Sequence, residues 1–158
     1  MPMNTNYRPR IVDEVLDLRM RHHPAILIVG PRATGKTTTA ARHARTVLRL
    51  DREGEAAAVR ADPDAAIRQL EEPILIDEWQ AVPAILGAVK RAVDSEPRPG
   101  RFLIAGSIRG VVDTPLWPGT GRLLKVPMYG MTVGELDFRI PEEPFLDRLS
   151  EGDLHSLL

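Results

Sequence analysis

Apolar residues along this chain form two patterns: short unbroken runs, and longer segments in which they recur every three or four positions. A short run rich in branched side chains is typical of a strand buried in a parallel sheet, whereas the longer spacing is typical of an amphipathic helix. The runs predict strands at residues 25–29, 56–61, 74–78, 101–105 and 122–126. The spacing predicts helices at residues 11–21, 37–50, 62–70 and 84–93, and the capping-box spacing of Thr132 and Glu135 predicts another helix start.

The predicted strands and helices alternate along the chain, which indicates an α/β fold with a parallel sheet covered by helices on both faces. Connections between neighbouring parallel strands are expected to be right-handed crossovers. The length of 158 residues and the hydrophobic fraction of 43% fit one domain with a real core. In such a sheet, ligands bind where the strands end, so residues that follow the strands are the candidates for function.

The strongest candidate follows the first predicted strand and reads Gly30-Pro31-Arg32-Ala33-Thr34-Gly35-Lys36-Thr37, the P-loop spacing G-x-x-x-x-G-K-[ST]. Backbone N–H groups of such a loop close around nucleotide phosphates, and the helix that begins at Thr37 and Thr38 favours the same negative charge. Lysine occurs only three times in the chain, so the placement of Lys36 is informative. Strand, loop and helix come in the required order, and residues 30–38 are therefore predicted to bind nucleotide.

A second candidate is Ile74-Leu75-Ile76-Asp77-Glu78, a buried strand that ends in two acids. In P-loop ATPases the first acid holds Mg²⁺ and a following glutamate orients the attacking water. We therefore interpret Thr37 and Asp77 as the Mg²⁺ ligands and Glu78 as the catalytic carboxylate. Trp79 directly follows this core strand and is interpreted as a packing residue.

A third candidate, Ser107, follows the predicted strand at residues 101–105. A polar side chain at that strand end can touch the γ-phosphate or the attacking water, because the strand ends of a parallel sheet face the ligand. The assignment of Ser107 depends on this position alone.

Composition narrows the classes of partner. The formal net charge of -1 gives no general electrostatic reason to bind nucleic acid or an anionic membrane. The absence of cysteine excludes disulfides, thiolate zinc sites and cysteine nucleophiles. No segment reaches membrane-spanning length and the first ten residues lack the apolar centre of a signal peptide, so we expect a soluble, cytoplasmic protein.

Four stretches of the chain together resemble the bacterial and archaeal AAA-type P-loop ATPases in which an N-terminal ATPase core is followed by a C-terminal nuclease-like domain of unknown function. The resemblance covers roughly residues 8 to 137, and one departure is Ala105, where family members often have threonine. The matching stretches are Gly30-Pro31-Arg32 through Lys36-Thr37-Thr38, Leu75-Ile76-Asp77-Glu78-Trp79-Gln80, Phe102-Leu103-Ile104-Ala105-Gly106-Ser107, and Gly121-Arg122-Leu123-Leu124 with Pro127 and Glu135.

The resemblance implies a three-layer fold of the additional-strand catalytic-glutamate class, with five parallel strands in the order 5-1-4-3-2 and with ATP and Mg²⁺ as ligands. In an ATPase of this kind, Lys36 contacts the β- and γ-phosphates and Ser107 senses the γ-phosphate. AAA-type ATPases supply an arginine finger from a neighbouring subunit just before the last core strand, so Arg122 is the candidate. A homo-oligomer and an unknown protein partner are the interactions that this resemblance implies.

The predicted organisation is an ATPase core at residues 1–137, followed at residues 138–158 by a tail or the start of a truncated second domain. Two other functions stay open at this point. A nucleotide-dependent switch with negligible hydrolysis has the same motifs, and multiple-turnover phosphate release separates it from an ATPase. A small-molecule kinase fits the loop but lacks an evident Arg/Lys-rich lid. A GTPase is disfavoured because asparagine occurs only at Asn4 and Asn6, which excludes the N-K-x-D motif.

Overall fold

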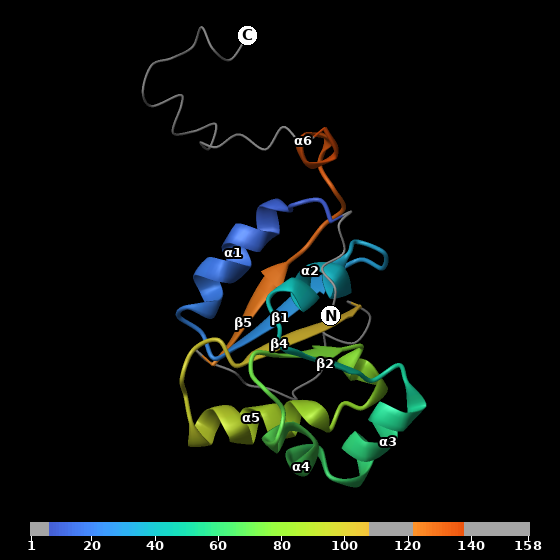
Figure 1. Ribbon diagram of the computed structural model, residues 1–158, viewed down its shortest axis with the longest axis vertical. Helices are drawn as coiled ribbons and strands as arrows, with labels where there is room; N and C mark the ends of the chain where they lie inside the picture. The colour runs from blue at the N-terminus through green and yellow to red at the C-terminus, as the bar shows by residue number, and fades with distance from the viewer. Residues whose placement is uncertain (1–6, 108–121, 138–158) are drawn as a thin grey trace, which may run out of the picture. The chain divides into compact units, whose positions relative to one another are not determined.

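A computed structural model describes residues 7–107 and 122–137 of the chain (Figure 1). These residues belong to two compact units. The larger unit spans residues 12–130, and the smaller one combines residues 7–11 with residues 131–137 in the described part of the chain. The predicted tail at residues 138–158 lies outside the described residues.

The larger unit is built on a five-stranded sheet in which every neighbouring pair is parallel. The strand order is β2-β3-β4-β1-β5, which confirms the expected order 5-1-4-3-2. The register places Gly30 at the end of β1 opposite Ser107 at the end of β4. The strands are β1 (Ala25–Gly30), β2 (Thr46–Arg49), β3 (Ile74–Asp77), β4 (Phe102–Ser107) and β5 (Leu123–Pro127).

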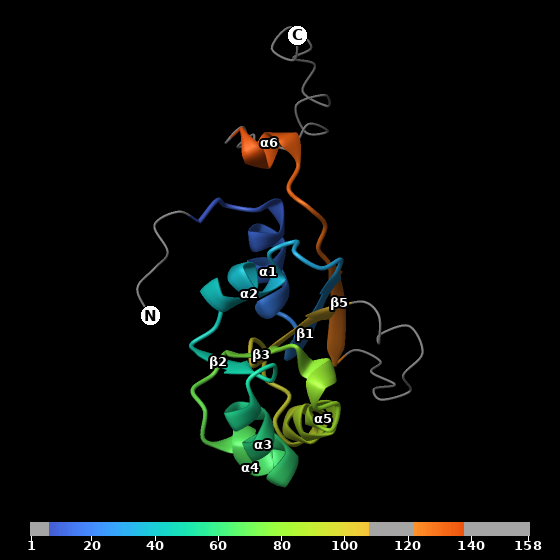
Figure 2. The same ribbon diagram turned by 90° about the vertical axis from the view of Figure 1, so that its right-hand side faces the viewer.

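Helices cover both faces of this sheet, as the two views show (Figures 1 and 2). On one face, Leu16 of α1 and Ala40 of α2 pack against Ile26 and Ile28 of the central strand. On the other face, α3, α4 and α5 pack against alternate residues of the same strands, such as Leu27. The helices are α1 (Ile11–Met20), α2 (Lys36–Arg42), α3 (Glu53–Ala61), α4 (Pro63–Arg68) and α5 (Ile85–Ser95), with a short 3₁₀ turn η1 (Trp79–Ala81) after β3. Of α1, the first residue, Ile11, belongs to the smaller unit and the rest to this one.

The predicted helix at residues 37–50 is wrong in its second half, because α2 ends at Arg42 and the chain then forms β2. The β2 strand pairs with β3 from Thr46 to Arg49, and Val47 and Leu48 pack into opposite faces of the sheet. This pairing joins residues about thirty positions apart in sequence, and such tertiary contacts override a local helical pattern.

The predicted strand at residues 56–61 is also wrong, since these residues form the greater part of α3. Alanine has the highest helix propensity and is depleted in strands, which explains the outcome. Ala56 and Val59 lie three positions apart on the buried side of α3, and Glu53 and Arg60 carry charges that suit the helix dipole at each end.

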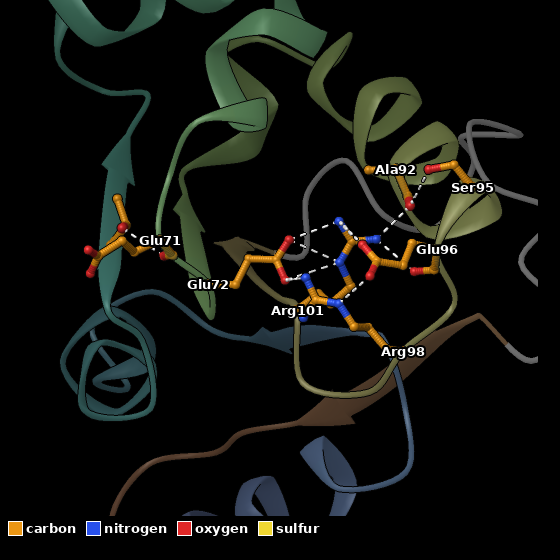
Figure 3. Close-up of polar contacts among 8 residues, drawn as sticks. Glu71, Glu72, Ala92, Ser95, Glu96, Arg98 and Arg101 are labelled. Carbon is orange, nitrogen blue, oxygen red and sulfur yellow. Dashed lines mark hydrogen bonds and ion pairs between the residues drawn. The ribbon is translucent and has the colours of Figure 1, made fainter.

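An ion-pair cluster centred on the buried Arg101 lies at the amino end of the sheet (Figure 3). Arg101, directly before β4, is only 7% exposed and binds Glu72 with Nε and Nη2, at 3.0 and 2.8 Å from Oε1. Its Nη1 donates to the backbone carbonyls of Ala92 and Glu96 at 2.6 and 2.7 Å. Arg98 adds a 2.8 Å ion pair to the other Glu72 oxygen. Each charge in the centre of this cluster is satisfied by another part of the chain.

The smaller unit contains α6 (Val133–Leu136), which begins with the predicted capping box. Glu135 is 4% exposed and accepts hydrogen bonds from the backbone N–H groups of Thr132 and Ile11 and from Arg10 Nε. Burial alone raises the pKa of Glu135, but these bonds together outweigh it and lower the pKa to about 2.

Candidate functional site

The P-loop leaves the carboxyl end of β1 and turns sharply before α2. Two of its residues, Ala33 and Gly35, have positive φ angles of 59° and 87°. Glycine adopts this conformation without steric cost, and Gly35 is the residue directly before α2. A Cβ atom at Gly30 would collide with the backbone carbonyl of Met128, so the first glycine of the motif is required by close packing. The loop sequence thus specifies the loop shape.

Lys36, the first residue of α2, folds back over the loop. It is 8% exposed, and its Nζ donates to the carbonyl oxygens of Gly30 and Pro31 at 3.1 and 2.6 Å. Burial lowers the pKa of Lys36, and the negative charges of Glu78 and Asp77 oppose that shift. These electrostatic contributions show that the ammonium and the two carboxylates share one region of the site.

Asp77 ends β3 and meets the next residue of the P-loop helix. Thr37 Oγ1 donates a 2.9 Å hydrogen bond to Asp77 Oδ1, joining residues forty positions apart. Asp77 is 6% exposed, and burial raises its pKa even though the Thr37 hydrogen bond lowers it. No cluster of three or more His, Cys, Asp or Glu side chains able to hold a metal occurs in residues 7–107 and 122–137. Thr37 Oγ1 and Asp77 Oδ1 are neighbouring oxygen atoms that could hold a metal together with oxygens of a ligand.

Glu78 lies directly after this strand with a left-handed backbone, φ 53° and ψ 44°. Its carboxylate Oε2 accepts a hydrogen bond from Gln80 Nε2. The prediction that Trp79 is a packing residue is confirmed, because its side chain is 3% exposed within the core.

A cavity of about 760 Å³ lies beside the loop. It brings together the predicted Lys36, Thr37 and Glu78 with two polar residues that were not predicted as site residues, Asp51 and Gln80. Gln80 ends the stretch at residues 75–80 that resembles the ATPase family, so this resemblance could have indicated Gln80 as a site residue. Asp51 could have been found only with β2 correctly placed, since it follows that strand. The full lining is Arg32, Ala33, Thr34, Gly35, Lys36, Thr37, Thr38, Asp51, Glu78, Gln80 and Ala81.

The two remaining predicted residues lie at different edges of the sheet. The backbone of Ser107 ends β4 opposite Gly30, and so lies beside the start of the P-loop. Arg122 directly precedes β5, whose first residue pairs with Ala25 at the amino end of β1. Its guanidinium forms an ion pair with Asp94, with the arginine side chain 52% exposed. Arg122 therefore lies at the sheet edge opposite the P-loop of its own chain.

Comparison with known proteins agrees with this geometry. Residues 22–137 match a family model described as an AAA domain. The chain belongs to the AAA domain family. AAA domains are nucleotide-binding modules of the ATPase type, so membership supports nucleotide binding at this site.

Two curated relatives of this AAA domain are the uncharacterized protein Mb2031c of Mycobacterium bovis and the uncharacterized protein Rv2008c of Mycobacterium tuberculosis. Each is 34% identical over 133 residues, which is 78% of this chain and 30% of the relative. The chain thus spans about a third of the length of these relatives. None of the helices in the described ranges has both the length and the apolar character needed to cross a membrane.

Proposed function

We propose that this AAA domain binds Mg-ATP and hydrolyses it to ADP and phosphate. The observation that carries the proposal is the convergence of Lys36, Thr37 and Glu78 on one cavity beside the P-loop, with Asp77 hydrogen-bonded to Thr37. An ammonium, a hydroxyl and two carboxylates in this arrangement match the groups that phosphoryl transfer to water uses.

In the binding step, the phosphates of ATP occupy the P-loop and the ammonium of Lys36 neutralises part of the charge of the β- and γ-phosphates. The ammonium already lies against the loop carbonyls of Gly30 and Pro31, so little side-chain freedom remains to be lost on binding. Arg32 and Thr38 are exposed on the same cavity wall and can add charge or hydrogen bonds to the phosphates.

Thr37 Oγ1 and Asp77 Oδ1 are hard oxygen donors 2.9 Å apart, which fits a magnesium ion that also takes phosphate oxygens. Bound Mg²⁺ supplies positive charge that offsets the charge developing on the phosphates. A buried Asp77 with a raised pKa is stabilised in its ionised form when a cation arrives.

In the hydrolytic step, the Glu78 carboxylate orients a water and accepts its proton as the oxygen attacks the γ-phosphorus. The bond between the γ-phosphorus and the bridging oxygen breaks, and the electron pair leaves with ADP. Ser107, at the end of β4, contacts the γ-phosphate and so senses whether it is present. Arg122 acts on the nucleotide of a neighbouring copy, because it lies at the opposite sheet edge of its own chain.

The test combines binding and turnover. Lys36→Ala should abolish Mg-ATP binding measured by calorimetry, whereas Glu78→Gln should keep near-parent affinity and lose multiple-turnover phosphate release. Circular dichroism and thermal melting check that both variants fold. Parent affinity in a folded Lys36→Ala protein contradicts the proposed binding mode. Tight binding with no turnover in the parent, at any concentration, contradicts the hydrolytic function.

A further inference from the structure

The side chain of Gln80 holds the carboxylate of Glu78 on the wall of the nucleotide cavity. Gln80 Nε2 donates to Glu78 Oε2, and both side chains line the cavity that contains Lys36. Of the two oxygens of the Glu78 carboxylate, Oε2 is the one that the Gln80 amide engages. The amide therefore distinguishes two carboxylate oxygens that are otherwise chemically equivalent.

Glu78 has a left-handed backbone at the point where this contact is made. A left-handed conformation costs a residue other than glycine about 1–2 kcal/mol, so the surroundings must hold it. Here the 3₁₀ turn η1 follows at once, with Ala81 N donating to the Glu78 carbonyl at 2.9 Å. The extended course of β3 ends before Glu78, and the side chains of Glu78 and Gln80 contact each other at the start of this turn.

The neighbouring strand β4 provides the space in which Gln80 lies. A Cβ atom at Gly106 would come within 2.7 Å of Trp79 Nε1, 2.8 Å of Trp79 Cδ1 and closer still to Gln80 Oε1. Real Cβ atoms essentially never approach heavy atoms so closely, so a side chain at Gly106 must displace Gln80 or the buried Trp79 ring. The absence of a side chain at Gly106 is thus a condition for the observed position of Gln80.

We propose that Gln80 is the positioning residue for Glu78, and that Gly106 provides the slot that keeps Gln80 in place. This inference rests on the proposed hydrolytic function of Glu78. With Oε2 engaged by the amide, Oε1 is the oxygen available to the attacking water. Fixing one rotational state of the carboxylate lowers the entropy lost in reaching the transition state, and a misplacement of about 1 Å can cost about 100-fold in rate.

The first test is Gln80→Met, which keeps the length of the side chain and removes the donor. If Gln80 positions Glu78, kcat should fall about 10- to 100-fold while the KM for ATP stays near the parent value. A residue that only fills the slot predicts an unchanged kcat. In a Glu78→Gln background, the same substitution should cause no further loss, because both changes act on one interaction.

A second variant, Gln80→Glu, keeps the shape of the side chain and replaces the donor with a carboxylate that repels Glu78. At neutral pH its kcat should be at least as low as that of Gln80→Met, with the KM for ATP near the parent value. A residue that only fills the slot predicts the parent kcat for this variant of the same shape.

The slot is tested by Gly106→Ala with Gly54→Ala as the matched control. A Cβ at Gly54 meets no atom within 4 Å and this residue lies in α3, so that variant should retain the parent kcat with an equal or higher melting temperature. Gly106→Ala should lower kcat and change the fluorescence of Trp79, measured in a Trp117→Phe background so that Trp79 is the remaining fluorescent indole.

Parent turnover or faster turnover in folded Gln80→Met overturns the positioning role and leaves the proposed function intact. Parent turnover in Glu78→Gln overturns the hydrolytic role of Glu78 itself.

Discussion

The two edges of the sheet carry cavities of nearly equal size, about 760 Å³ beside the P-loop and about 740 Å³ at the amino ends of the strands. Both are lined by charged side chains. At the amino edge, Arg101 and Glu72 bind each other and nearby carbonyl groups. At the carboxyl edge, Lys36 and Asp77 are buried with shifts of pKa that disfavour their charged forms. The two cavities differ in the partners of their charges: Arg101 and Glu72 neutralise each other, whereas Lys36 and Asp77 are hydrogen-bonded to uncharged groups.

The pKa directions give this contrast a physical meaning. Burial lowers the pKa of Lys36 and raises that of Asp77, so each charge costs folding free energy in the free protein. A ligand with complementary charge can offset that cost. At the carboxyl end, burial disfavours the charged forms of Lys36 and Asp77, whereas at the amino end Arg101 and Glu72 neutralise each other. This difference is expected if the carboxyl end binds a polyanion and a cation.

The largest expected effect concerns Arg122. If this residue acts on the nucleotide of a neighbouring copy, the amino end of the sheet has a catalytic function and the contrast between the two ends no longer holds. Arg122 lies there, paired with Asp94. If it acts as an arginine finger in trans, Arg122→Ala should lower turnover about 10³- to 10⁵-fold without weakening ATP binding. Lys36→Ala and Arg122→Ala proteins should then hydrolyse ATP faster when mixed than either does alone.

The trans mechanism also makes activity per molecule rise with protein concentration. Association of the two variants is checked by analytical ultracentrifugation, and a Lys125→Ala variant controls for loss of positive charge on β5. An absence of rescue in a mixture that demonstrably associates would falsify the trans assignment of Arg122.

The next largest effect concerns stability at the amino edge. Arg101→Leu leaves the partly buried Glu72 with Arg98 as a remaining ion-pair partner, so the loss of unfolding free energy should approach but not exceed the value of about 3–5 kcal/mol for breaking a fully buried pair. Chemical denaturation measures this loss, and ATP affinity in the folded fraction should be unchanged. Arg91→Ala is the control, because it removes the exposed pair with Asp64 and should have little effect. A loss of ATP affinity in folded Arg101→Leu would join the two edges functionally.

A third prediction extends the contrast to the smaller unit, where Glu135 is satisfied like Glu72. Its pKa of about 2 lies below the value of 4.5 for a free glutamate, so its contribution is complete above about pH 4.5 and is lost as the pH falls towards 2. Glu135→Gln should reduce hydrogen-exchange protection of the Ile11 and Thr132 amides at neutral pH, by an amount that corresponds to about 1.5–3 kcal/mol. The difference from the parent should shrink in acid. A constant difference from pH 7 to 3 contradicts the assigned role of the Glu135 charge.

Local sequence predicted much of this molecule and failed where a distant partner decides the structure. Four of the five strands follow from apolar runs, and the capping box predicted α6. The β2 strand was missed because its partner is β3, and no property of Thr46 to Arg49 alone indicates that pairing. The error then propagated to α3, where a strand was expected in place of β2.

The site was predictable to the same degree. Lys36, Thr37, Asp77 and Glu78 belong to motifs whose spacing reflects their chemistry, so local sequence was sufficient to bring them into one hypothesis. Asp51 was missed because it depends on β2. The bond between Gln80 and Glu78 forms at a left-handed backbone position and beside the slot at Gly106, neither of which a linear pattern reveals.

The smallest expected effect is on the stability of an Asp77→Asn variant. This variant separates the contribution of Asp77 to Mg-ATP binding from its contribution to folding. Asp77→Asn keeps the side-chain shape and can still accept the Thr37 hydrogen bond, while it removes a buried charge. Because the folded pKa of Asp77 lies above the unfolded value of 3.8, the charge opposes folding at neutral pH and ceases to do so as the pH falls through the folded value. The variant should therefore be more stable than the parent at pH 7, by about 0.5–2 kcal/mol, and this gain should fade in acid. The Mg²⁺ dependence of ATP binding should weaken in the same protein.

Asp64→Asn provides a control of opposite sign, since the hydrogen bond from Arg91 lowers the pKa of Asp64. Denaturation of the three proteins between pH 7 and 4 tests the prediction, and a destabilised Asp77→Asn at pH 7 would show that the charge of Asp77 is already compensated within the free protein.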